Sequence, residues 1–228
     1  MTQQKILIFD ASTLISFAMN GLLPEFKELK KIFNGKFIIT NEVKAEIIDK
    51  PLHIQRFELQ ALQLKQLIDE GILELASVLG ISDSDIAKEG NLFLNTANSV
   101  FIGKRKEIKL ISLGEASCLG LSKLLNQQKV SNVIGVDERT TRMLCEKPDN
   151  LKNLLNKRLH TQIKVDESKL NMFNGFKFVR SAELVYVAYK KNLVKLKNGN
   201  VLNALLWAVK LKGCAISPEE INEIKGIK

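Results

Sequence analysis

The chain has 228 residues, of which 45% are hydrophobic and 26% charged. This length fits one ordinary domain with additions, and no stretch approaches the roughly 20 apolar residues of a membrane-spanning helix, which excludes an integral membrane protein. The formal charge is +9, from 34 Lys and Arg against 25 Asp and Glu, and such an excess favours polyanions, nucleic acid first among them.

The N-terminus and the cysteines both predict a cytoplasmic location. Met1 leads through polar residues into a short apolar segment, without the basic start and long apolar region of a secretion signal. Cys118, Cys145 and Cys214 are odd in number and far apart, so they offer neither a disulfide framework nor zinc-site spacing. We expect reduced, buried thiols.

Five short apolar runs predict strands. They are residues 5–9, 36–40, 72–76, 132–136 and 176–179. The segments between them are predicted to be helical, and this alternation implies right-handed crossovers and a mostly parallel sheet covered on both faces. We therefore expect an α/β fold, a three-layer α/β/α sandwich with a mostly parallel five-stranded sheet and added C-terminal helices.

The first half of the chain carries clear signals for helix ends. Ser12 or Thr13 is a plausible cap for a helical stretch to residue 35, which Pro24 restarts. Thr40 or Asn41 can cap a helix to residue 49 that Pro51 closes. Residues 55–70 and 83–98 are also predicted helices. The first of these two has an expected buried face made of Phe57, Ala61, Leu64 and Ile68.

The second half continues the pattern. Residues 112–125 are predicted to form a helix that can approach the sheet closely, because one of its faces contains small residues. This face comprises Leu113, Ala116, Gly120 and Leu124. A short helix covers residues 138–146, and a basic one residues 151–160. Ser181 is expected to cap the next helix, and Ser217 begins a capping box for the last. We expect one domain: a core of residues 1–146, an insertion of 147–175, and a last strand with C-terminal helices in 176–228.

Two acidic residues directly follow predicted strands. Asp10 and Asp137 therefore emerge on the same rim of the sheet, where ligand sites of parallel sheets lie. Neighbouring carboxylates repel, and a hard cation such as Mg²⁺ or Mn²⁺ relieves the repulsion. The pattern favours a metal site on this rim.

Four segments together resemble the PIN-domain family of metal-dependent ribonucleases, which includes toxins of toxin–antitoxin pairs. They are ILIFDAST around Asp10, ITNEVKAEI around Glu46, SLGEASCLGL around Glu115 and VIGVDERTTR around Asp137. The resemblance covers residues 5 to about 145, and the tail looks like a subgroup with an extra helical C-terminal region. It implies a PIN-like fold in which these four acids hold the metal and RNA phosphodiesters are hydrolysed.

Supporting roles are also expected. Ser12 and Thr13 resemble the family's small polar position after the first acid, where a hydroxyl orients a carboxylate or a metal-bound water. A set of cationic side chains is expected to hold RNA phosphates without reading sequence. It comprises Lys104, Arg105, Lys106, Arg139, Arg142, Lys157 and Arg158. We further expect the insertion, with Lys152 and Lys164, to extend an RNA-binding groove.

Each acid also has an ordinary explanation. Asp10 and Asp137 can simply cap helices, and Glu115 completes a capping box with Ser112. Glu46 can be a solvated helix residue. Other acids compete for the same places: Glu42 and Asp49 for that of Glu46, and Glu138 beside Asp137. The shared metal site is favoured because all four ordinary explanations would have to hold at once.

Other functions fit less well. His53 and His160 have no partners for zinc or a Ser-His-Asp triad, there is no glycine-rich phosphate loop, and Asp10 lacks the adjacent acids of a phosphoacceptor site. The main alternative is a catalytically silent PIN-like RNA-binding or assembly subunit. Toxin and RNA-processing roles stay equally open, as do an antitoxin or other protein partner and a homodimer.

Overall fold

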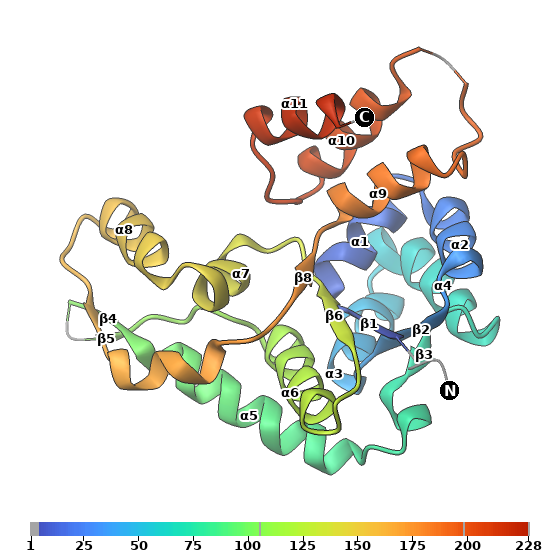
Figure 1. Cartoon of the computed structure of the whole chain (residues 1–228). Helices are drawn as coiled ribbons and strands as arrows, with labels where there is room; N and C mark the ends of the chain where they lie inside the picture. Colours follow the sequence, from blue (N-terminus) through green and yellow to red (C-terminus); the bar gives the residue numbers. More distant parts are fainter. Residues whose placement is uncertain (1–4, 105, 198, 228) are drawn as a thin grey trace.

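A computed structural model describes residues 5–104, 106–197 and 199–227 and places a five-stranded, all-parallel sheet at the centre of the molecule (Figure 1). The strand order is β3-β2-β1-β6-β8. The strands are β1 (Lys5–Phe9), β2 (Gly35–Ile39), β3 (Glu74–Leu75), β6 (Asn132–Gly135) and β8 (Phe178–Val179). The predicted strands and the α/β/α class are confirmed, although β3 and β8 are only two residues long.

One face of the sheet is covered by α1 (Ala11–Met19), α2 (Leu23–Ile32) and α9 (Ser181–Lys190). Phenylalanines fill this layer: the ring of Phe9 lies 5.0 Å from those of Phe26 and Phe37. The cap of α1 is Asp10, so the prediction of Ser12 or Thr13 was wrong by two or three residues, whereas the ordinary explanation of Asp10 as a helix cap is correct. The carboxylate directly after the strand begins the helix because its side chain reaches the Ser12 N–H.

The opposite face is covered by α6 (Leu113–Gln127), with α5 (Asp83–Val100) packed outside it. Cys118 of α6 donates a hydrogen bond to the Phe9 carbonyl of β1. The face of α6 that contains Gly120 packs against α5 and not against the sheet, contrary to our prediction. A Cβ on Gly120 would lie 2.7 Å from the Gly90 nitrogen, and Leu113 is exposed. Small residues permit a close approach of two backbones, and here the partner backbone is a helix.

The connection after β2 combines three kinds of helix. Thr40 caps α3 (Asn41–Lys44) as predicted, and a π-helix η1 (Ala45–Asp49) follows. Pro51 starts a 3-10 turn, η2 (Pro51–His53), where we had predicted only an end. The next helix, α4 (Gln55–Asp69), packs against α1. Its buried residues are Ala61, Leu64 and Leu67, whereas Phe57 is exposed.

A second, antiparallel sheet of order β5-β4-β7 was not predicted. It contains β4 (Phe101–Gly103), β5 (Lys106–Glu107) and β7 (Lys164–Val165), whose lengths are too short to leave an alternating pattern in the sequence. The insertion thus pairs through β7 with β4, which on its other side pairs with β5 of the basic 104–109 region. Two helices, α7 (Arg139–Glu146) and α8 (Pro148–Leu159), lie in the same lobe, at the left of Figure 1.

The remaining elements are short 3-10 turns and the C-terminal helices. The turns are η3 (Ala76–Leu79) and η4 (Glu167–Phe173); the helices are α10 (Val201–Leu211) and α11 (Pro218–Gly226). The capping box at Ser217 is confirmed, whereas α9 is capped by Arg180 and Ser181 is its first residue. The three cysteines are free, with Cys145 only half-buried. Within the described residues, no helix has the length and apolar character to cross a membrane.

Candidate functional site

The four acids singled out in the sequence gather at the carboxyl edge of the parallel sheet. Asp10 follows β1, Asp137 lies two residues beyond β6, Glu46 lies in η1 and Glu115 in the first turn of α6. Their charges influence one another: Asp10 raises the pKa of both Glu46 and Glu115, and Asp137 raises that of Asp10. Asp10 is therefore the centre of the group.

Asp10 is buried, with 3% of its surface exposed. Its Oδ2 accepts hydrogen bonds from the Ser12 N–H at 3.0 Å and the Ser12 hydroxyl at 2.6 Å. Its Oδ1 is also buried but has no hydrogen-bond partner in the part of the chain that the structure describes. Burial, and then the charge of Asp137, raise the pKa of this carboxyl group against the opposing effect of Ser12.

Ser12 links two of the acids. Its hydroxyl donates to Asp10 and accepts from the Asp137 backbone N–H at 3.0 Å, so it fixes the spacing between the two strand ends. Thr13 lies in the buried interior, and its hydroxyl oxygen has no partner among the described residues. Of the two expected supporting hydroxyls, only that of Ser12 contacts the acids.

Glu46 is half-buried and is held by the backbone of α6. Its Oε1 accepts from the Gly114 N–H at 3.2 Å, and a Cβ on Gly114 would lie 2.7 Å from Oε2. Burial and the charge of Asp10 raise its pKa. Of the two competing acids, Asp49 is exposed and pairs with Lys44 at 2.9 Å. Glu42 is half-buried and its charge reaches Cys118, but Glu46 is the acid of this segment whose pKa Asp10 raises.

Glu115 combines the capping box with a contact across the site. Its Oε2 accepts from the Ser112 N–H at 2.8 Å, and its Oε1 accepts a short hydrogen bond from the Thr141 hydroxyl of α7. Burial, and then Asp10, raise its pKa to about 7. The capping box with Ser112 is therefore present, but it does not explain why Glu115 is buried beside Asp10.

Asp137 is bound by a residue that the sequence analysis named only as a helix cap. Ser181, the first residue of α9, donates its N–H to Oδ1 at 2.7 Å and its hydroxyl to Oδ2 at 2.6 Å. Burial raises the pKa of Asp137 while Ser181 lowers it. The position of Ser181 two residues after a predicted strand was the available signal, because residues that follow parallel strands reach the same rim as Asp10. Glu138 is exposed and accepts a hydrogen bond from Thr140.

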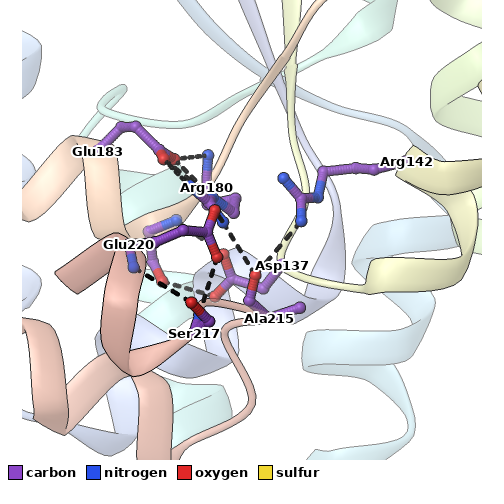
Figure 2. A network of polar contacts seen from close by, with 8 residues as sticks. Asp137, Arg142, Arg180, Glu183, Ala215, Ser217 and Glu220 are labelled. Atoms are coloured by element: carbon purple, nitrogen blue, oxygen red, sulfur yellow. Dashed lines mark hydrogen bonds and ion pairs between the residues drawn. The ribbon is translucent and has the colours of Figure 1, made fainter. Parts of the chain in front are cut away.

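A polar network ties the C-terminal helices to this edge (Figure 2). The Ala215 N–H donates to the Asp137 carbonyl at 3.1 Å, and the Ala215 carbonyl accepts from Arg180 at 3.0 Å and from Arg142 at 3.3 Å. Arg180 also pairs with Glu183 and with Glu220, the latter at 2.9 Å. Arg142, predicted to hold RNA, is half-buried and engaged in this network.

The other expected RNA contacts lie on the surface. Lys104 follows β4 and Lys106 begins β5, and both are exposed, while Arg105 lies outside the described residues. Lys157 and Arg158 are exposed at the end of α8, and Arg139 is exposed at the start of α7.

The chemistry of the donors suits a hard cation, because all four groups present carboxylate oxygens and one of these, Asp10 Oδ1, is buried without a partner among the described residues. The four acids are not arranged as a complete metal site. Among residues 5–104, 106–197 and 199–227, no three His, Cys, Asp or Glu side chains are already placed as ligands of a single metal ion.

Comparisons with protein-family models, curated proteins and solved structures find no match to this chain.

Proposed function

We propose that this chain is a divalent-metal-dependent ribonuclease of the PIN type. The observation that carries the proposal is the buried Oδ1 of Asp10, which lacks a partner among the described residues and lies in the electric field of three further acids. A buried carboxylate oxygen without a donor is costly, and a cation removes that cost.

The roles of the four acids differ. Asp10 and Glu46 would be the principal ligands, because each has an oxygen that no hydrogen bond among the described residues occupies. Glu115 would join after exchanging its Thr141 contact for the cation. Asp137, with both oxygens bound by Ser181, would act through its charge and by positioning Ser12. A bound Mg²⁺ or Mn²⁺ would supply an activated water and neutralise charge on the phosphate.

The substrate is inferred from charge. The +9 excess and the exposed cations of the β4/β5 turn and of α8 favour a polyanion, and phosphate contacts of this kind position a strand without reading its sequence. RNA follows from the PIN resemblance of the four motifs. Toxin and RNA-processing roles fit these observations equally.

One observation favours the silent module as the second candidate. Both oxygens of Glu115 and both of Asp137 already accept hydrogen bonds from the protein, as in acids kept for structure. Such a protein would bind RNA through its basic surface and would bind no Mn²⁺ at Asp10.

Mn²⁺ titration followed by thermal unfolding separates the two candidates. With Mn²⁺ at about 100 times its Kd, a ligand of the native state should raise the Tm by about 5 to 10 °C. Asp10→Asn should abolish both this shift and the cleavage of a mixed-sequence RNA. Asp49→Asn, which removes an exposed acid of the same region, should retain both. A wild type that shows neither shift nor cleavage supports the silent module.

A further inference from the structure

An apolar groove opens beside the carboxylates, between α1, α4 and the turns that join β2 to α4. Its volume is 490 Å³, and Glu46 forms part of its wall. The two helices lie side by side (Figure 1). We propose that this groove is a base-binding site, in which Phe57 stacks on the base of an unpaired nucleotide next to the phosphate held at the acids. This inference rests on the proposed function.

The walls of the groove suit a flat aromatic ring. Four of the lining side chains are large, apolar and more than a third exposed: Ile15, Met19, Ile54 and Phe57. Phe57 is the only aromatic residue among the lining residues, and Arg56 already lies 5.5 Å from its ring centroid. Stacking on an exposed aromatic ring is how proteins hold unpaired bases without regard to sequence.

The groove also contains an unsatisfied polar group. Gln60 lines it, and Gln60 Oε1 is buried with no hydrogen-bond partner in the described part of the chain. An amide in an apolar wall presents both a donor and an acceptor, which matches the edge of a nucleobase. A purely apolar ligand, such as an acyl chain, would leave this group unpaired.

Charge complementarity also favours a nucleotide. Lys50 and Lys212 line the same groove, and Glu46 connects it to the acidic group. A base in the groove would place its phosphates between these lysines and the proposed metal. A stacked, paired base cannot enter such a groove, because it must first leave its helix.

The test measures binding without chemistry, in EDTA, using fluorescence anisotropy of a labelled single-stranded RNA and of the duplex of the same sequence. Phe57→Ala should weaken single-strand binding about 5- to 100-fold and leave duplex binding unchanged. Phe57→Trp in a Trp207→Phe background should restore the affinity, and stacking should quench its emission. Leu59→Ala, an exposed residue of α4 that does not line the groove, is the matched control.

The outcomes distinguish the base site from the proposed nuclease. If wild type binds Mn²⁺ and cleaves RNA but Phe57→Ala binds single strands as tightly as Leu59→Ala does, the base site is overturned, and a protein segment becomes the better occupant of the groove. If no Mn²⁺ binds and yet Phe57→Ala selectively loses single-strand affinity, the groove stands and the nuclease proposal fails. Melting temperatures of the variants verify that each is folded.

Discussion

Ser181 donates two hydrogen bonds to Asp137, one to each carboxylate oxygen, at 2.7 and 2.6 Å. The pair joins the start of α9 to the end of β6, although the two residues lie 44 positions apart. A carboxylate bound in this way is both an acid of the site and an anchor for the C-terminal helices.

We predict that Ser181→Ala lowers the free energy of unfolding by about 1.5 to 3 kcal/mol, because it leaves a buried carboxylate oxygen without its donor. Urea denaturation measures the change. Ser168→Ala is the control, since its hydroxyl makes a 2.6 Å bond to Asp166 on the exposed surface. An equal loss in both variants would show that the Asp137 pair has no special weight.

Glu115 should make stability depend on pH between its ordinary pKa of 4.5 and its raised pKa of about 7. A pKa raised on folding means that the folded state holds its proton more tightly. The resulting stabilisation is full below pH 4.5 and is lost as the pH rises to about 7. Across this window, the free energy of unfolding of the wild type should fall by up to about 3 kcal/mol relative to that of Glu115→Gln.

Urea denaturation of both proteins at about pH 5, 6, 7 and 8 tests this, and parallel curves would contradict it. Gln is the appropriate replacement because it keeps the capping-box geometry with Ser112. Mn²⁺ affinity should follow the opposite course and increase with pH up to about 7, because protons compete with the metal for the carboxylates.

The contact between α5 and α6 should not tolerate a methyl group at Gly120. Its Cβ would lie 2.7 Å from the Gly90 nitrogen and 3.2 Å from the Glu89 carbonyl carbon, both backbone atoms that cannot move alone. Gly120→Ala should therefore cost about 1 to 3 kcal/mol in unfolding free energy. Gly226→Ala, with nothing within 4 Å of its Cβ, should be neutral. A neutral Gly120→Ala would mean that the helices separate easily.

The cations at the end of α8 should set the salt dependence of RNA binding. Reversing the charges of Lys157 and Arg158 should weaken binding to single strands and duplexes alike. It should also lower the slope of log affinity against log salt by about 1 for each phosphate that is no longer neutralised. Reversal of Lys190 and Lys191, exposed at the end of α9, is the control. Identical slopes in the two double variants would assign the RNA surface elsewhere.

Local sequence determined most of the helices and strands, and it determined the edge of the sheet at which the acids lie. Apolar runs that stop at Asp10 and just before Asp137 predicted strands ending in carboxylates, and parallel strands must bring such ends to one rim. The capping boxes at Ser112 and Ser217 were equally readable, because their partners lie three residues apart.

Tertiary structure alone decided which distant residues touch. The position of Ser181 after a strand places it on the rim of the sheet, but it does not predict that Ser181 binds Asp137. Nothing local predicts that the Gly120 face meets α5, or that β7 of the insertion pairs with β4. It also decided the chemistry of the acids: an isolated Asp or Glu titrates near pH 4, and only burial beside other carboxylates raises the pKa of Asp10 and Glu115. Burial and proximity arise from contacts between residues distant in the chain, whereas a capping signal resides within a single turn.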